Sequence, residues 1–381
     1  MHFKTIRLQH FRNHTDSKFE LSSGTNILLG NNGQGKTNVL EAISYLCLTK
    51  SFYAGGDYLV LKFGSTMFEV DGMAHSDSGK QYDIHVAFSE PEKEKVFTIN
   101  KHRAEPLSSV IGKFPIVICS PEHALITSEG PSERRKFIDF VISQSNNTYF
   151  QNLIEYRKVI KHRNKVLFDG KFSRQNIASL LEPWNEQLVE RGSYLIIKRK
   201  QFVEEFHEYI RTAYRSIATD SEQPSIDYQP ANTQNMISTQ DGVRAYLYAA
   251  LREKQEEELR LGTSIVGPHR DELLMTINGL DLRKYASQGQ HKTFLIALKI
   301  GEFFYLKDRC NETPILLLDD IFSELDYERA ARLLNFVSTL SQTFITSTNP
   351  HFIPEKNMHD VSRKTFHIAD GKIVASGIRA A

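Results

Sequence analysis

The chain has 381 residues, which is enough for a large core and two lobes. Because 47 Lys and Arg balance 46 Asp and Glu, a nucleic-acid surface would have to be a local patch rather than a global field. Three widely spaced cysteines and fourteen histidines without ligand spacing argue against a disulfide framework and a metal centre. With no signal-peptide pattern and no apolar run of membrane-spanning length, we expect a soluble, cytoplasmic protein.

Residues 3–29 are predicted to form strands that lead into a glycine-rich loop, and residues 39–48 to begin a helix. Between them the chain matches G-x-x-x-x-G-K-[ST] at every constrained position. In this motif the glycines let backbone N–H groups and the helix N-terminus face a phosphate. Lys36 would reach the β- and γ-phosphates, and Thr37 would bind Mg²⁺. The sequence therefore predicts a site for ATP and Mg²⁺; a glycine-rich turn without a ligand is the alternative. The loop consists of Gly30, Asn31, Asn32, Gly33, Gln34, Gly35, Lys36 and Thr37.

The middle of the chain changes character twice. Residues 67–103 suggest an antiparallel β subdomain, and residues 115–119 a buried strand that returns to the main sheet. From about 132 to 261 the apolar period is helical, and the polar stretch 220–235 is predicted to be an exposed loop. We predict an α/β fold: an ABC-type P-loop ATPase head, with a mixed sheet and the antiparallel subdomain, into which a helical second lobe is inserted. The predicted parts are residues 1–130 for the N-terminal part of the head, 131–285 for the helical lobe and 286–381 for the rest of the head.

Two further motifs follow the helical part. Ser287-Gln288-Gly289-Gln290 begins an apolar-periodic helix and offers a hydroxyl, free N–H groups and a positive dipole end to an anion. By itself this is only a capped helix. The apolar run 314–318 ends in Asp319 and Asp320, as a buried strand does when it delivers acids to a sheet edge. Asp319 is predicted to hold Mg²⁺ through its hydration shell, and Asp320 to orient or deprotonate the attacking water.

In this order the motifs are typical of ABC-type ATPases, and over essentially the full length the chain resembles the RecF family of SMC-like ABC ATPases. A P-loop kinase would lack the Ser287–Gln290 motif, and a transporter's nucleotide-binding subunit would have a shorter insertion. The residues that carry the resemblance are 8–13, the phosphate loop with Asn38 and Glu41, 120–122, 130–139, 267–271, 287–290, 317–320 and 323–326, of which 324–326 resemble a D-loop.

The resemblance implies an ATP-dependent DNA-binding protein of replication-coupled repair. Such proteins bind double-stranded and gapped DNA, act with RecR and RecO to load RecA, hydrolyse ATP slowly, and form a homodimer when ATP binds. Carried over to this chain, Ser287 and Gly289 act in trans on the nucleotide of the partner subunit, and Arg12 touches phosphate. Lys36, Asp319, Asp320 and Ser287 are then the catalytic residues, Thr37 and Asp319 position Mg²⁺, and residues 30–37 with Asn38 hold the triphosphate. Ser51-Phe52-Tyr53 stands where relatives usually carry an arginine, and Thr348 where other ABC proteins have a switch histidine; His351 is a candidate for the γ-phosphate sensor.

A basic run in the helical part is the candidate DNA contact. Spacings of three and four place its members on overlapping helix faces, and few acids intervene. A solvated basic face is the alternative. The run comprises Arg157, Lys158, Lys161, Arg163 and Lys165. Arg270 and Asp271 are predicted to form a structural ion pair rather than to act in catalysis. A related ATPase that binds proteins instead of DNA, and a small-molecule kinase, are the competing functions.

Overall fold

The computed structural model describes residues 1–171, 177–218, 222–231, 239–321, 333–334, 336–348 and 362–379. The chain divides into two compact units. Unit 1 consists of Met1–His123 and Leu298–Ala381, and unit 2 of Ala124–Ala297. Residues 286–297, which we predicted to belong to the ATPase head, thus fall in unit 2. The predicted D-loop residues 323–326 and His351 lie outside the described residues.

Unit 1 contains two six-stranded sheets. The first is antiparallel in the order β2-β1-β4-β5-β6-β7, so the subdomain predicted at 67–103 forms together with the N-terminal strands. The second, in the order β15-β14-β3-β13-β12-β8, is parallel except for β15. The strands of the first sheet are β1 His2–Phe11, β2 His14–Glu20, β4 Met67–His75, β5 Gln81–Ser89, β6 Glu94–Ile99 and β7 His102–Arg103. Those of the second are β3 Thr25–Leu29, β8 Ile116–Cys119, β12 Ile315–Leu318, β13 Thr343–Ser347, β14 Arg363–Ala369 and β15 Lys372–Arg379.

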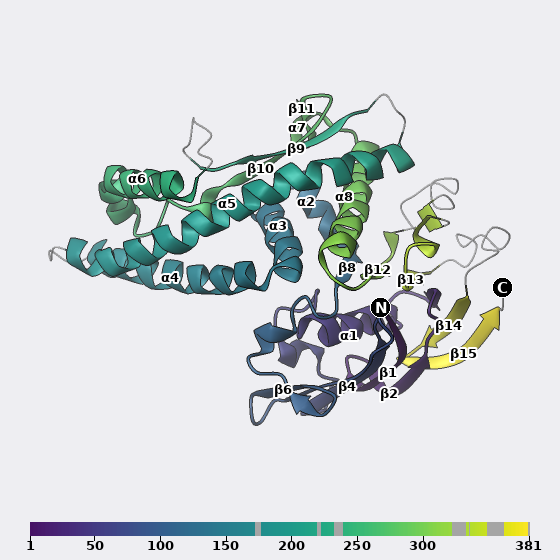
Figure 1. The fold of residues 1–381 in the computed structure, drawn as a ribbon. Helices are drawn as coiled ribbons and strands as arrows, with labels where there is room; N and C mark the ends of the chain where they lie inside the picture. The colour runs from purple at the N-terminus through teal and green to yellow at the C-terminus, as the bar shows by residue number, and fades with distance from the viewer. Residues whose placement is uncertain are drawn as a thin grey trace. The chain divides into compact units, whose positions relative to one another are not determined.

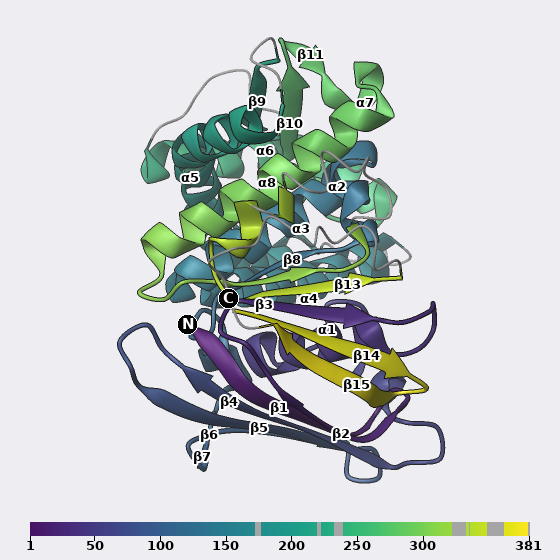
Figure 2. The same ribbon diagram turned by 90° about the vertical axis from the view of Figure 1, so that its right-hand side faces the viewer.

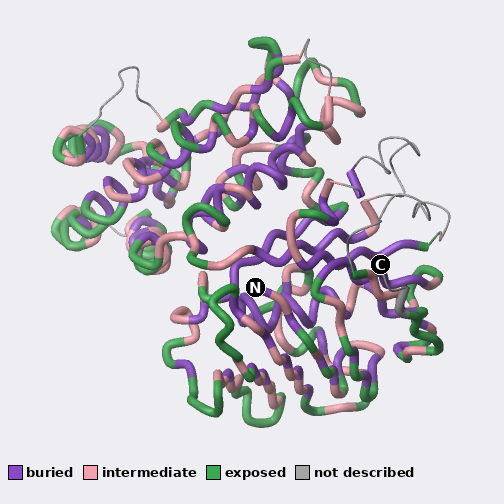
Figure 3. Tube along the Cα trace, turned by 45° about the vertical axis from the view of Figure 1, so that its right-hand side comes forward, coloured by how far each residue is buried: buried purple, intermediate pink, exposed green. Residues whose placement is uncertain are grey.

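Helix α1 (Lys36–Leu48) contacts strands of both sheets, as Figure 2 shows. It is buried on nearly every side from Val39 to Leu48, as expected of a segment in which apolar residues fall on every side of the helix. The parallel strands β3, β8, β12 and β13 are likewise buried on both faces (Figure 3). Because these strands run parallel, the carboxyl ends of β3, β12 and β13 meet at one edge of the sheet. Short 3-10 helices η1 Asp57–Val60 and η2 Leu107–Val110 belong to this unit, and η3 Pro121–Ala124 ends at the first residue of unit 2.

Unit 2 is mainly helical, as predicted. Its long helices α4, α5 and α6 pack against one another (Figure 1). The helices are α2 Leu125–Ser128, α3 Pro131–Ser145, α4 Asn147–Lys171, α5 Ala178–Ile217, α6 Gln240–Leu261 and α7 Leu282–Tyr285, with the 3-10 helix η4 Pro268–Arg270. Helix α8 (Gln288–Arg309) begins in unit 2 and ends in unit 1. Among the described residues, no helix combines the length and the apolar character needed to cross a membrane.

A three-stranded sheet in the order β11-β10-β9 belongs to unit 2. Strands β10 (Glu272–Ile277) and β11 (Leu280–Asp281) form a hairpin that turns at Asn278-Gly279. Strand β9 (Pro224–Gln229) corrects our prediction of a loop at 220–235. It alternates buried and more exposed residues and pairs antiparallel with β10, from Pro224 opposite Ile277 to Gln229 opposite Glu272. The strand exists because of this distant partner, which its own polar composition does not reveal.

Candidate functional site

The phosphate loop follows β3 directly and needs glycine at two positions. Gly35 has φ +104°, and a Cβ there would lie 2.5 Å from Asn13 Oδ1. At Gly30 a Cβ would lie 2.3 Å from the carbonyl oxygen of Ile368. Larger residues would clash with these neighbours and, at Gly35, strain the backbone as well. Packing against the rest of unit 1 thus fixes the curvature that the motif predicts.

Lys36 begins helix α1 at the end of this loop. Its Nζ donates hydrogen bonds of 2.8 Å to the carbonyl oxygens of Gly30 and Asn31. Burial lowers the pKa of this ammonium group, while Asp320 and Asp319 act in the opposite direction. The first turn of α1 holds no acidic side chain, and no side chain caps it. Its N–H groups and the positive end of its dipole are therefore available to an anion beside the lysine.

A carboxylate from a distant strand joins the loop. Thr37 Oγ1 donates to Asp319 Oδ1 at 2.8 Å, and Thr346 Oγ1 donates to the same oxygen at 2.7 Å. The pKa of the Asp319 carboxyl is raised, because burial outweighs the hydrogen bonds from Thr346 and Thr37. A hydroxyl and a carboxylate oxygen side by side are ligands that Mg²⁺ accepts. Thr37 and Asp319 thus fit the predicted cation, which would offset the cost of burying this carboxylate.

Asp320 follows at the carboxyl end of β12 with a positive φ of +49°. Its backbone N–H donates to Thr346 Oγ1 at 2.8 Å, so Thr346 holds both acidic residues. Left-handed backbone at a non-glycine residue is uncommon, and here it turns the chain sharply after the strand. The structure brings Asp319 to the loop; the role of Asp320 toward water stays a prediction.

Two further predicted phosphate-site residues are engaged with other protein groups. Arg12 makes a two-pronged ion pair with the buried Glu41, 2.8 Å at both contacts, and its NH1 donates to the carbonyl oxygen of Leu59. Asn38 Nδ2 donates to Asn13 Oδ1 at 2.8 Å. Both therefore brace the turn between β1 and β2 against α1, and contact of either residue with phosphate stays a prediction.

Ser287 and Gly289 lie at the start of α8, in unit 2. The Ser287 N–H donates to Gln290 Oε1 at 2.8 Å, and the Gln290 N–H donates to Ser287 Oγ at 3.2 Å. This is a capping box, in which cap and third helical residue satisfy each other's N–H groups. Ser287 is exposed, and its action in trans stays a prediction. Thr348 is exposed just after β13.

The basic run on α4 is only partly a surface feature. Arg163 was predicted to contact DNA, but it is 1% exposed and donates to Asn185, Ser264 and Glu258, with 2.5 Å to Glu258 Oε2. It is therefore a core residue and not a candidate DNA contact. The exposed members are Arg157, which lies 3.5 Å from Asp139, Lys158, which is paired with Glu155, and Lys161 and Lys165.

Arg270 and Asp271 do not pair with each other. Arg270 donates to the carbonyl oxygen of Ser264, at 2.9 Å from NH2. Asp271 is buried, accepts a short hydrogen bond from Tyr228, and lies 3.6 Å from Arg199. The prediction that Arg270 and Asp271 form an ion pair is thus wrong. Asp271 instead belongs to a buried charge network with Arg199, which also donates to the carbonyl oxygen of Pro268 in η4.

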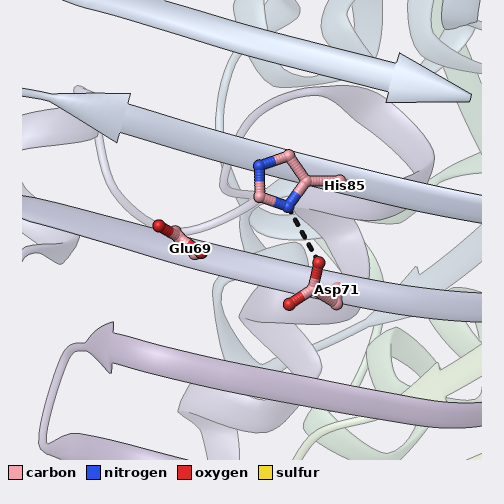
Figure 4. Close-up of side chains that lie close together, drawn as sticks. All are labelled: Glu69, Asp71 and His85. Carbon is pink, nitrogen blue, oxygen red and sulfur yellow. Dashed lines mark hydrogen bonds and ion pairs between the residues drawn. The ribbon is translucent and has the colours of Figure 1, made fainter. Parts of the chain in front are cut away.

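Among the described residues, one histidine and carboxylate cluster has ligand atoms close enough to hold a metal ion. Glu69, Asp71 and His85 lie on neighbouring strands β4 and β5, and their ligand atoms are within 4.8 Å of one another (Figure 4). Asp71 Oδ1 is 2.8 Å from His85 Nδ1 and raises the pKa of that histidine. A cross-strand ion pair accounts for this cluster, and we assign no metal to it.

Three comparisons with known proteins show what this chain is similar to. A family model described as an AAA domain matches residues 5–263. The "DNA replication and repair protein RecF" of Chloroherpeton thalassium is 42% identical over 349 residues, covering 90% of this chain and 94% of the relative. A solved structure of the recombination mediator protein RecF-ATPrS in the RecFOR pathway has a TM-score of 0.90 at 32% identity, covering 100% of this chain and 98% of that one. An SMC head bound to the C-terminal winged-helix domain of ScpA, 13% identical with a TM-score of 0.56, shares the fold.

Proposed function

This chain belongs to the RecF family of DNA replication and repair proteins, and from that premise we propose that it is a recombination-mediator ATPase whose ATP binding is coupled to DNA binding. The observation that carries the proposal is the meeting of Lys36, Thr37 and Asp319 at one sheet edge. Thr37 Oγ1 and Asp319 Oδ1 are 2.8 Å apart although 282 positions separate them in the chain. A bare glycine-rich turn does not require a buried carboxylate beside its threonine.

Each residue has a physical task in binding and hydrolysis. The N–H groups of the loop and of the first turn of α1 receive the phosphate oxygens, and Lys36 exchanges its two carbonyl partners for phosphate. Thr37 and Asp319 would hold Mg²⁺, which neutralises developing charge on the phosphates. Asp320 orients the attacking water. The cytoplasmic DNA-repair role and the partners RecR and RecO are proposed from the family.

We propose that the DNA partner is double-stranded or gapped DNA, held through its phosphates by the exposed face of α4. Arg157, Lys158, Lys161 and Lys165 supply this face. Arg157 and Lys158 also have acidic neighbours, whereas Lys161 and Lys165 form no salt bridge with an acid among the described residues. Contacts of this kind give backbone-directed binding with little sequence preference.

The ATP site is tested by Lys36→Ala. We expect this variant to weaken the binding of a fluorescent ATP analogue by about tenfold to a hundredfold, because charge-assisted hydrogen bonds to phosphate are removed. The control is Lys80→Ala, which removes an exposed lysine from the turn between β4 and β5. Far-ultraviolet circular dichroism checks that both variants fold. Wild-type affinity and hydrolysis in Lys36→Ala would refute the assignment of the site.

A further inference from the structure

A turn late in the chain forms hydrogen bonds with the phosphate loop. This turn, Asp370–Gly371, joins β14 to β15. The Asp370 N–H donates to the side-chain oxygen of Gln34 at 2.7 Å, and the Gly371 N–H donates to the backbone carbonyl oxygen of Gln34 at 3.0 Å. Both the side chain and the backbone of one loop residue, two positions before Lys36, are therefore held by the same turn.

The close packing leaves no room for a side chain at Gly371. Gly371 has φ +69°, and a Cβ there would lie 2.3 Å from the carbonyl oxygen of Asn13. Asn13 is in the turn between β1 and β2, and its side chain reaches Asn38 at 2.8 Å. The C-terminal turn, the N-terminal turn and the phosphate loop thus form one close-packed group of backbone.

A buried pair of side chains on β2, His14 and Ser17, links the phosphate loop to the C-terminal turn. His14, which has no exposed surface, places Nε2 at 3.1 Å from the carbonyl oxygen of Gly35 and Nδ1 at 2.9 Å from Ser17 Oγ. Ser17 Oγ donates to the carbonyl oxygen of Gly371 at 2.9 Å. These contacts, all at hydrogen-bond distance, run from the residue before Lys36, through His14 and Ser17 of β2, to the C-terminal turn.

These interactions fall on the loop itself rather than on the strands beneath it. A phosphate loop binds through backbone N–H groups that must point at the ligand before it arrives, so fixing the loop's conformation lowers the cost of binding. We propose that the turn Asp370–Gly371 is a positioning element of the phosphate loop, acting through Gln34 and through the His14–Ser17 pair, and that nucleotide affinity depends on it. This inference rests on the proposed ATP binding.

The first test compares three glycine substitutions in the full chain. Gly371→Ala introduces the clash with Asn13. Gly377→Ala lies in the same hairpin with no atom within 4 Å of its Cβ, and Gly79→Ala has a positive φ of +82° but open space. We expect Gly371→Ala to bind a fluorescent ATP analogue about tenfold more weakly and to raise KM more than it lowers kcat. Gly377→Ala and Gly79→Ala should bind like wild type.

The second test uses Ser17, which touches the turn but lies outside the loop. Ser17→Ala removes the link from His14 to Gly371 and should weaken nucleotide binding by about threefold to tenfold, with Ser17→Thr restoring affinity through its hydroxyl. If Gly371→Ala does not fold, Ser17→Ala and Ser17→Thr still test whether nucleotide affinity depends on the turn. Wild-type affinity in Ser17→Ala, and in Gly371→Ala where that variant folds, would overturn the inference while leaving the proposed function intact. A wild-type chain that bound no nucleotide would overturn both.

Discussion

At the scale of single residues, the partners of a buried charged group decide whether it serves chemistry or the fold. From the sequence alone, Lys36 and Arg163 are both simply basic residues. Lys36 is held by two carbonyl oxygens that a phosphate can replace, whereas Arg163 is closed in by Glu258 and two polar side chains. The motif around Lys36 made its site predictable. The spacing of the basic residues alone could not distinguish the buried Arg163 from the exposed Lys161 and Lys165, because the acid that pairs with Arg163 is far along the chain.

His269 is a residue whose protonation should be visible in stability. It lies 2.7 Å from Tyr156 Oη and 3.1 Å from the carbonyl oxygen of Ser264, and burial lowers its pKa to about 4. Above its ordinary pKa of 6.5 both folded and unfolded chains carry it neutral. Between 6.5 and about 4 only the unfolded chain binds the proton, so the free energy of unfolding falls as the pH falls, by at most about 1.4 kcal/mol per unit.

Urea unfolding of wild type and His269→Gln at about pH 7 and about pH 5 measures this contribution. We expect wild type to lose more stability than the variant on going to the lower pH, because glutamine cannot titrate. His14 and His123, whose pKa values burial also lowers, contribute equally to both proteins. Parallel losses in the two proteins would contradict the assignment.

At the scale of elements, strongly patterned segments could be predicted and weakly patterned ones could not. The buried strands β3 and β12 and the helix α1 follow from apolar runs next to motifs. Strand β9 was missed because it depends on hydrogen bonds to β10, more than forty positions away. The hydrogen bonds from the β14–β15 turn to Gln34 could not be predicted either, since a glycine in a turn does not reveal what packs against it.

Helix α4 has two faces that should respond differently to substitution. Arg163→Ala leaves Glu258 buried without its partner and should cost about 3–5 kcal/mol of unfolding free energy in urea. Lys161→Ala and Lys165→Ala, on the exposed face, should change stability by less than about 0.5 kcal/mol.

The two lysine variants should instead weaken binding to duplex DNA, and each should reduce the slope of log affinity against log salt concentration by about one. Anisotropy titrations at two salt concentrations measure this effect, and unchanged DNA affinity in both lysine variants would exclude this face.

At the scale of the whole molecule, the fold class and the two ends of the ATPase head could be predicted because each end carries its own motif. The point at which the chain passes between units could not be predicted, since α8 is one continuous helix that begins in unit 2 and ends in unit 1. Its first residues belong to unit 2, so the Ser287 motif and the phosphate loop are parts of different units.

The proposed action in trans makes a prediction about assembly. Ser287 is exposed at the start of α8, so Ser287→Arg should place a bulky cation on the surface that meets the nucleotide of a second copy. We expect wild type to form a dimer with ATP and Mg²⁺, measured as mass by light scattering, and Ser287→Arg to remain a monomer while binding the fluorescent ATP analogue as tightly as wild type. Ser78→Arg, in the exposed turn between β4 and β5, is the matched control and should dimerise normally. An ATP-dependent dimer in Ser287→Arg would show that the serine motif does not meet the nucleotide across two copies.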